Sequence, residues 1–214
     1  MLLPEFMNNG RDERIDAFSQ VFRQYVKEED FFLDIGANFG EATIAAGEIV
    51  KKGLVISIEA NPIAVEFLQK NCIYKKINAH IYNLAFSDIE ENSDFVFNGS
   101  SDNGGIINGY EASRGFNHDS IYMNVKCVKA YDFLLERYSE HLEKISFIKV
   151  DTEGMDVRIL RNLLPFIKKY RPGIFFEDFP YCGCTEKALE FIDEMKEYYN
   201  AKKLTQDFLL IKKT

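Results

Sequence analysis

Cysteine is scarce in this chain of 214 residues, which contains only Cys72, Cys127, Cys182 and Cys184. Four cysteines at such irregular spacing do not form a disulfide framework. Cys182 and Cys184 flank a single residue, but a structural zinc site needs four ligands and no second Cys or His pair lies nearby. We therefore interpret this pair as two cysteines of a loop.

Basic charge and long apolar runs are also lacking. Lys and Arg number 26 against 34 Asp and Glu, which gives a formal net charge of −8. A nucleic-acid footprint needs a basic face, so this charge argues against such a partner. No apolar run is long enough to span a membrane, and the first residues lack a signal-peptide pattern. We expect a cytoplasmic protein with no nucleic-acid or membrane partner.

The stretch 32–40 is the most informative part of the chain. An apolar run breaks at Asp34 and enters a glycine-rich turn, and a helical pattern begins at Glu41. Gly36 and Gly40 have no Cβ, so the chain can turn sharply and a ligand can approach the backbone. The free N–H groups at the helix start can hold an anionic group. This order of strand, tight loop and helix predicts a ligand site.

A second feature lies nineteen residues after Gly40, where another apolar strand ends at Glu59. An acid at this strand tip, which we expect to face solvent, can accept hydrogen bonds from both hydroxyls of a ribose. Asn61 and Pro62 then predict a helix start, because Asn is a good N-cap and Pro is favoured at the first helical position. This spacing favours a nucleoside-containing cofactor over a plain βαβ unit with a surface Glu.

Asn38 indicates which cofactor this is. A dinucleotide site has a second Gly at this position, so that the backbone can approach the pyrophosphate closely. The Asn38 side chain can instead hydrogen-bond a small zwitterion, and Asp34 can face an ammonium group. A cofactor with an amino acid at one end and a ribose at the other fits better, and S-adenosylmethionine has that shape. A nicotinamide-dependent oxidoreductase on the same topology is the alternative.

Apolar periodicity predicts alternating helices and strands. After a helix at 11–29, the expected order is strand 31–35, helix 40–50, strand 54–59, helix 62–75 and strand 79–86. This is the first half of a doubly wound sheet. The later elements expected are helix 131–140, strand 145–150, helix 155–170 ended or kinked at Pro165, strand 172–176, helix 185–198 and strand 207–212. We expect a helical segment, 1–30, packed on one domain, 31–214.

The middle of the chain differs from both ends. Residues 98–120 are rich in Gly, Asn and Ser, between strands expected at 92–97 and 121–129, so we expect a loop insertion at about 92–125. A long loop in a compact domain is usually functional or disordered, and a lid over the cofactor is the functional interpretation. His118 lies in this loop and is either a general base near neutral pH or simply solvated.

Acids end five of the predicted strands, namely Asp34, Glu59, Asp88, Asp151 and Glu177. In an open parallel sheet, ligands bind outside the carboxyl ends of the strands. So many acids on one edge are unfavourable unless something cationic or rich in hydroxyls lies among them. A sulfonium cofactor and a hydroxylated substrate meet that condition.

Asp151 and Glu153 lie in a strand-to-helix turn, where acids also cap helices and interact with the helix dipole. Their functional alternatives are a general base on the acceptor hydroxyl, a contact to the methionyl group, and a ligand of a divalent metal. Glu177 with Asp178 would complete a metal site of oxygen ligands. These alternatives stay open at the level of sequence, so a divalent metal is not assured.

Five motifs carry a resemblance to a known family: LDIGANFG at 33–40, EANP at 59–62, NLAFSD at 83–88, ISFIKVDTEGMD at 145–156 and RPGIFFE at 171–177. Over about residues 31–212 the chain resembles the FkbM-type S-adenosylmethionine-dependent methyltransferases. The resemblance implies a Rossmann-like methyltransferase fold, with a doubly wound, mostly parallel seven-stranded sheet and an antiparallel last strand. It also implies O-methylation of a hydroxyl on a sugar, glycan or small metabolite.

The leading hypothesis gives each motif a role. The residues expected to bind the cofactor are Asp34, Gly36, Asn38 and Gly40 at the methionyl part, Glu59 with Asn61 at the ribose, and Ser87 with Asp88 beside the adenine. The residues expected to face the acceptor are Asp151, Glu153, Glu177 and His118. A non-catalytic cofactor-binding module is a further alternative, and the acidic charge disfavours a nucleic-acid methyltransferase.

Overall fold

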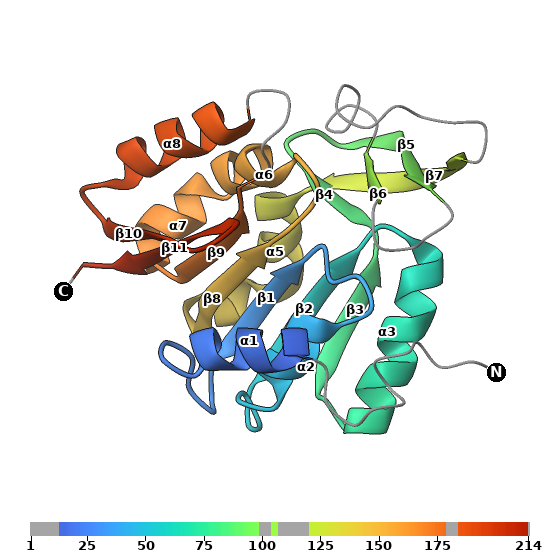
Figure 1. Cartoon of the computed structure of the whole chain (residues 1–214), viewed down its shortest axis with the longest axis horizontal. Helices are drawn as coiled ribbons and strands as arrows, with labels where there is room; N and C mark the ends of the chain where they lie inside the picture. Colours follow the sequence, from blue (N-terminus) through green and yellow to red (C-terminus); the bar gives the residue numbers. More distant parts are fainter. Residues whose placement is uncertain (1–12, 99–103, 107–119, 179–183, 214) are drawn as a thin grey trace.

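The computed structural model describes residues 13–98, 104–106, 120–178 and 184–213, which form an α/β fold around a seven-stranded sheet (Figure 1). The strands lie in the order β10-β11-β9-β8-β1-β2-β3. Their bounds are Tyr199–Lys203, Asp207–Lys212, Gly173–Glu177, Ile145–Val150, Phe31–Ile35, Leu54–Glu59 and Ala79–Asn83, in that order. Strand β11 is antiparallel to both β9 and β10, and the other pairs are parallel. The expected antiparallel last strand is therefore confirmed.

The register of the central strands brings the site together. Ile35, the last residue of β1, lies opposite Ile58 of β2 and Val150 of β8. These three strands therefore end at one level, and the loops that follow them meet at one edge of the sheet. All six residues of β2 are buried, as expected for a parallel strand covered on both faces.

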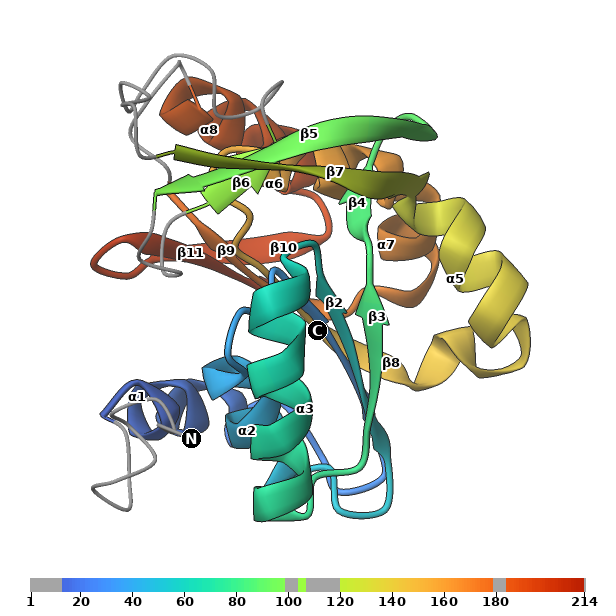
Figure 2. The same cartoon turned by 90° about the vertical axis from the view of Figure 1, so that its right-hand side faces the viewer.

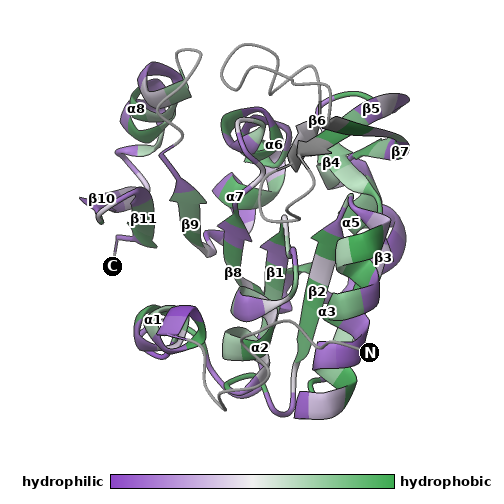
Figure 3. Cartoon of the chain, turned by 45° about the vertical axis from the view of Figure 1, so that its right-hand side comes forward, coloured by the Kyte–Doolittle hydropathy of each residue, from purple (hydrophilic) through white to green (hydrophobic). Residues whose placement is uncertain are grey.

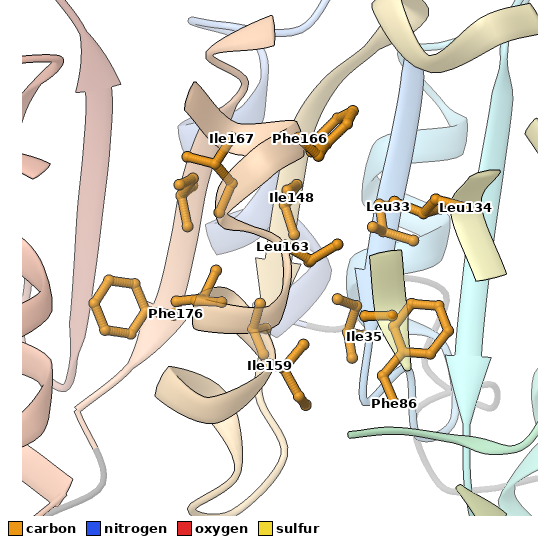
Figure 4. Close-up of a cluster of buried hydrophobic side chains, with 14 of the residues drawn as sticks. Leu33, Ile35, Phe86, Leu134, Ile148, Ile159, Leu163, Phe166, Ile167 and Phe176 are labelled. Atoms are coloured by element: carbon orange, nitrogen blue, oxygen red, sulfur yellow. The ribbon is translucent and has the colours of Figure 1, made fainter. Parts of the chain in front are cut away.

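Helices cover both faces of the sheet (Figure 2). On one face lie α1 (Glu13–Phe22), α2 (Glu41–Gly47) and α3 (Pro62–Lys75), and on the other lie α5 (Ala130–Tyr138), α6 (Asp156–Asn162), α7 (Leu164–Tyr170) and α8 (Cys184–Met195). Phe32 of β1 packs toward α1 and α2, whereas Leu33 and Ile35 pack toward the opposite face, as Figure 4 shows. Side chains alternate across a strand, which produces this division.

Apolar residues gather on the central strands, and polar residues on the outward sides of the helices (Figure 3). The predicted helix 155–170 is divided at Leu163 into α6 and α7. Pro165 stands at the start of α7, where its missing N–H breaks no helical bond. None of the helices in the described ranges is both long enough and apolar enough to span a bilayer.

A second sheet lies across the carboxyl end of the first (Figure 2). It has the order β4-β7-β5-β6, with β4 at Ala85–Ser87, β7 at Ser120–Lys129, β5 at Glu91–Asn98 and β6 at Gly104–Ile106. Strands β5 and β7 confirm the strands expected on either side of the middle loop. Most of that loop, including His118, lies outside the described residues, so the lid remains a prediction.

The strand expected at 79–86 is wrong in extent, because the chain leaves the first sheet after Asn83. The Asn83 amide donates to the carbonyl oxygens of Glu59 and Ala60, and the chain then continues into β4 of the second sheet. Strand β10 was not expected either. Only one of its five residues is buried, and it is held by backbone pairing with β11, which leaves no apolar pattern in the sequence.

Candidate cofactor and acceptor site

A cavity of about 220 Å³ opens at the carboxyl ends of β1, β2 and β8. Its wall combines residues from both sheets and from the first helix. The lining residues used below are Arg14, Phe18, Gly36, Asn38, Glu41, Glu59, Asn61, Leu84, Ala85, Phe86, Phe95, Lys149, Asp151 and Glu153. The cavity thus lies at the sheet edge where open α/β folds bind their ligands.

Gly36 allows the loops after β1 and β8 to touch. Its φ angle is +75°, and a Cβ atom there would lie 1.8 Å from the backbone oxygen of Asp151. Any side chain would therefore both strain the backbone and push the two loops apart. The close approach is supported by a backbone hydrogen bond from the Asp151 N–H to the oxygen of Ile35, at 3.0 Å.

Asn38 stands in the left-handed region with φ of +47°, a conformation that Asn tolerates better than most residues. Its backbone N–H donates to Oε2 of Glu59 at 2.8 Å. Its side-chain Oδ1 is buried and accepts no hydrogen bond from the described part of the protein. A buried acceptor on a cavity wall is a position for a ligand N–H donor, since leaving it unpaired is unfavourable.

Glu59 joins two loops through both of its carboxylate oxygens. Oε2 accepts from Asn38, and Oε1 accepts from the N–H of Asn61 at 2.7 Å. Burial raises the pKa of Glu59, although the hydrogen bonds from these two amides favour the charged form. The solvent-facing tip that we expected is wrong, because Glu59 is only 7% exposed. It lines the cavity and also holds the loop in shape.

Asn61 has the capping role that the sequence predicts. Its Oδ1 accepts from the N–H of Ile63 at 2.9 Å, and Pro62 follows at the first position of α3. Gly40, by contrast, is absent from the cavity wall. A Cβ atom on Gly40 would lie 2.6 Å from Cδ1 of Leu68, so this glycine lets α3 pack against the loop.

A buried ion pair lies beneath the loop. Asp34 has no exposed surface, and its Oδ2 accepts a 2.6 Å hydrogen bond from Thr43. The Nζ of Lys149 lies 3.4 Å from Asp34 and 3.5 Å from Asp151, and it donates to the oxygen of Gly36 at 2.7 Å. The ammonium group that faces Asp34 is therefore that of Lys149, and Asp34 does not line the cavity.

Lys149 is one of the site residues that sequence reasoning missed. Burial by itself lowers the pKa of Lys149, but the carboxylates of Asp34 and Asp151 outweigh this and raise it above the ordinary value. A single lysine inside the apolar strand 145–150 was the available signal, because an unpaired charge there would be very unfavourable.

Ser87 and Asp88 lie outside the cavity wall. Asp88 forms an ion pair with Arg158 at 2.6 Å, and although burial alone would raise the pKa of Asp88, this contact lowers it overall. The wall near them is formed instead by the preceding apolar segment 84–86 together with Phe95 of β5. An apolar surface next to Glu59 is suited to an aromatic base beside a ribose.

The acids expected to face the acceptor divide into two groups. Asp151 and Glu153 line the cavity, and the Asp151 side chain is 43% exposed. Glu177 lies outside the wall, where burial and then the charges of Asp151 and Asp156 raise its pKa to about 9. Burial and the Asp151 charge also raise the pKa of Asp156 and of Asp207, in each case to about 6.

The oxygen ligands considered for a metal do not converge in the described ranges. Asp178 forms an ion pair with Lys203 and accepts a 2.7 Å hydrogen bond from Thr185. Among the residues that the structure describes, no group of three or more His, Cys, Asp and Glu side chains has the arrangement of a metal site.

The sequence pattern of the Methyltransferase FkbM domain matches residues 34–202. The chain therefore belongs to the FkbM family of S-adenosylmethionine-dependent methyltransferases, as the motifs indicated. No curated protein matches the chain significantly.

Solved structures share the fold at low sequence identity. The methyltransferase FkbM from Methylobacillus flagellatus KT has a TM-score of 0.58 and 12% identity, over 92% of this chain and 52% of that one. The O-methyltransferase from Bacillus cereus in complex with SAH has a TM-score of 0.56 and 12% identity, over 98% of this chain and 84% of that one. The precorrin-6y C5,15-methyltransferase from Geobacter metallireducens GS-15 has a TM-score of 0.53 and 13% identity, over 94% of this chain and 87% of that one. The chain spans about half the length of the M. flagellatus protein.

Proposed function

We propose that this chain binds S-adenosylmethionine and transfers its methyl group to a hydroxyl of a small molecule or glycan. The observation that carries the proposal is the cavity at the strand ends, with Glu59 in its wall and the partly exposed carboxylate of Asp151 at its edge. Membership of the FkbM family and the fold shared with an O-methyltransferase in complex with SAH support it.

The cavity wall fits the parts of this cofactor. Glu59 would accept hydrogen bonds from the ribose hydroxyls, and the apolar segment 84–86 with Phe95 would cover the adenine. The buried Oδ1 of Asn38 would accept from the ammonium of the amino-acid part. When bound, the cofactor supplies a methyl group carried on a sulfonium.

Asp151 is the residue proposed to act on the acceptor. Its Oδ2 lies 3.5 Å from the buried ammonium of Lys149, and its backbone N–H is bonded to Ile35, so the carboxylate is held from two sides. In this position it orients the acceptor hydroxyl and takes its proton, while Glu153 lines the same wall. A non-catalytic cofactor-binding module makes no use of a proton acceptor there, whereas a nicotinamide-dependent oxidoreductase differs from this proposal in the cofactor that it binds.

Calorimetric titration with S-adenosylmethionine, S-adenosylhomocysteine and NAD tests the cofactor. We expect the first two to bind and NAD not to bind, because the Asn38 side chain stands where a pyrophosphate needs Gly. Tight NAD binding without a signal for S-adenosylmethionine would favour the oxidoreductase.

A methyl-transfer screen over glycans and small hydroxylated metabolites tests the reaction. Transfer to a hydroxyl that persists in a chelator supports Asp151 as the base, whereas loss in chelator and recovery with Mg²⁺ would favour a metal route. Cofactor binding without transfer to any acceptor would favour the non-catalytic module.

A further inference from the structure

Helix α1 contributes to the cavity although it precedes the family motifs. Arg14 and Phe18, one turn apart on α1, both line the cavity. The helix is held firmly in this position, because Phe22 at its end is fully buried against Phe32 and Phe147 of the sheet. A charged side chain on a well-packed helix is therefore part of the cavity wall.

Arg14 is itself held by an acid of the wall. Its Nη2 lies 2.8 Å from Oε1 of Glu41, the first residue of α2. The Glu41 side chain is 8% exposed and that of Arg14 is 58% exposed, so the pair presents its cation outward and buries its anion. A guanidinium is a planar fork of N–H donors that matches the geometry of a carboxylate.

The charges around the cavity are unequal. Four acids line it, namely Glu41, Glu59, Asp151 and Glu153, against two cations, Arg14 and Lys149. Lys149 is buried and directed at Asp34, Asp151 and a backbone oxygen. Of the two cations in this wall, Arg14 is therefore the one that reaches solvent. A ligand that carries a carboxylate is repelled by the acids of the wall unless its carboxylate lies beside Arg14.

We propose that Arg14 binds the carboxylate of the amino-acid part of the cofactor, and that Glu41 holds the guanidinium in place for it. The subsite is thus a carboxylate site supplied by α1, in the same cavity wall as Asn38 and Glu59. This proposal rests on the proposed function, since it assigns one group of the same cofactor. A purely structural ion pair that fastens α1 to α2 is the competing explanation.

Two ligands that differ only in the carboxylate separate these explanations. S-adenosylhomocysteine carries the group, and 5′-deoxy-5′-(3-aminopropylthio)adenosine is the same molecule without it. Dissociation constants for both are measured by calorimetry on the wild type, on Arg14→Gln and on Arg23→Gln. Arg23 follows α1, is exposed and is not part of the cavity wall, so its variant makes the same charge change away from the site.

We expect Arg14→Gln to weaken S-adenosylhomocysteine by about tenfold to a hundredfold, the effect of losing a hydrogen bond between charged groups. The same variant should change the affinity of the ligand without a carboxylate by less than about twofold, and Arg23→Gln should change neither. Equal weakening of both ligands by Arg14→Gln, or weakening of neither, would overturn the proposal.

The wild-type protein provides a test that does not depend on any variant folding. It should prefer S-adenosylhomocysteine over the ligand without a carboxylate by the same factor of about ten to a hundred. Equal wild-type affinities would overturn the carboxylate subsite while leaving the proposed function intact. Failure of both ligands and of S-adenosylmethionine to bind would instead overturn the proposed function itself.

Discussion

Two stretches of the sheet edge near the cavity place their acids in different environments. At the β1–β2 edge, formed by residues 36–40 and 59–61, the carboxylate of Glu59 is paired with two backbone N–H groups. At the β8–β9 edge, formed by residues 151–156, Glu177 and Asp207, acids lie near other acids, and burial and then the charge of Asp151 raise the pKa values of Asp156, Glu177 and Asp207. The first edge is already organised, as cofactor binding requires. At the second edge the carboxylate of Asp151 lies 3.5 Å from Lys149 and is partly exposed, and this is where we propose that the acceptor hydroxyl binds.

The largest effect is expected at Asp151, the exposed acid of the β8–β9 edge. Asp151→Asn should lower the rate of methyl transfer by roughly 10²–10⁴-fold, the scale of lost general acid–base help. The affinity for S-adenosylhomocysteine should stay nearly unchanged, because the β1–β2 edge is intact. Single-turnover kinetics and calorimetry measure the two quantities. If cofactor binding is lost while residual chemistry persists, Asp151 contacts the methionyl group and the division between the edges fails.

Gly36 tests whether the two edges depend on each other. Gly36→Ala should lower the free energy of unfolding by roughly 2–5 kcal/mol, because the new Cβ strains a left-handed backbone and overlaps the Asp151 oxygen. The variant molecules that fold should bind cofactor and transfer methyl groups poorly, because both loops are displaced. Denaturant unfolding gives the stability. A variant as stable as the wild type would show that the loops can separate without penalty.

Glu59 tests the organised edge. Glu59→Gln should weaken S-adenosylhomocysteine by about 1.5–3 kcal/mol, the range for hydrogen bonds to a charged group. Unlike a residue at a solvent-facing tip, Glu59 should also lower stability when replaced, because one amide oxygen cannot accept from both Asn38 and Asn61. Glu66→Gln on α3 is the matched control, since Glu66 is exposed and not in the cavity wall. An unchanged dissociation constant would remove Glu59 as the ribose ligand.

The last effect, expected at Glu177, concerns stability and its pH dependence and not methyl transfer. Its pKa rises from 4.5 unfolded to about 9 folded, so the folded state binds the extra proton between these values. The contribution of Glu177 to the free energy of unfolding is fully present below pH 4.5 and is lost as the pH rises toward 9. Glu177→Gln should therefore flatten the pH dependence, with a melting temperature that exceeds the wild type by a growing margin from pH 6 to pH 9. The exposed Glu186→Gln is the control, and a margin that does not change with pH would contradict the shift.

Much of the fold was readable from local pattern. Strands 31–35, 54–59 and 145–150 coincide with β1, β2 and β8, because a strand buried on both faces is a continuous apolar run. The elements that were missed or overextended are those whose limits depend on pairing. Strand β10 has no apolar pattern, and β3 ends at Asn83, whose side chain donates to Glu59 at the end of the neighbouring strand and to Ala60 just after it.

For the site, the sequence by itself determined the family, the glycine loop, the acid after β2 and the capped start of α3, since these reside in short motifs with fixed local geometry. Only the tertiary structure decided which residues reach the cavity. The loops after β1 and β8 are more than a hundred residues apart in sequence, and Gly36 meets Asp151 only because their strands pair in register. That pairing buries Lys149 against Asp34, and the packing of Phe22 brings Arg14 to the wall. Burial and distance between remote segments are properties of the folded chain, and no local pattern encodes them.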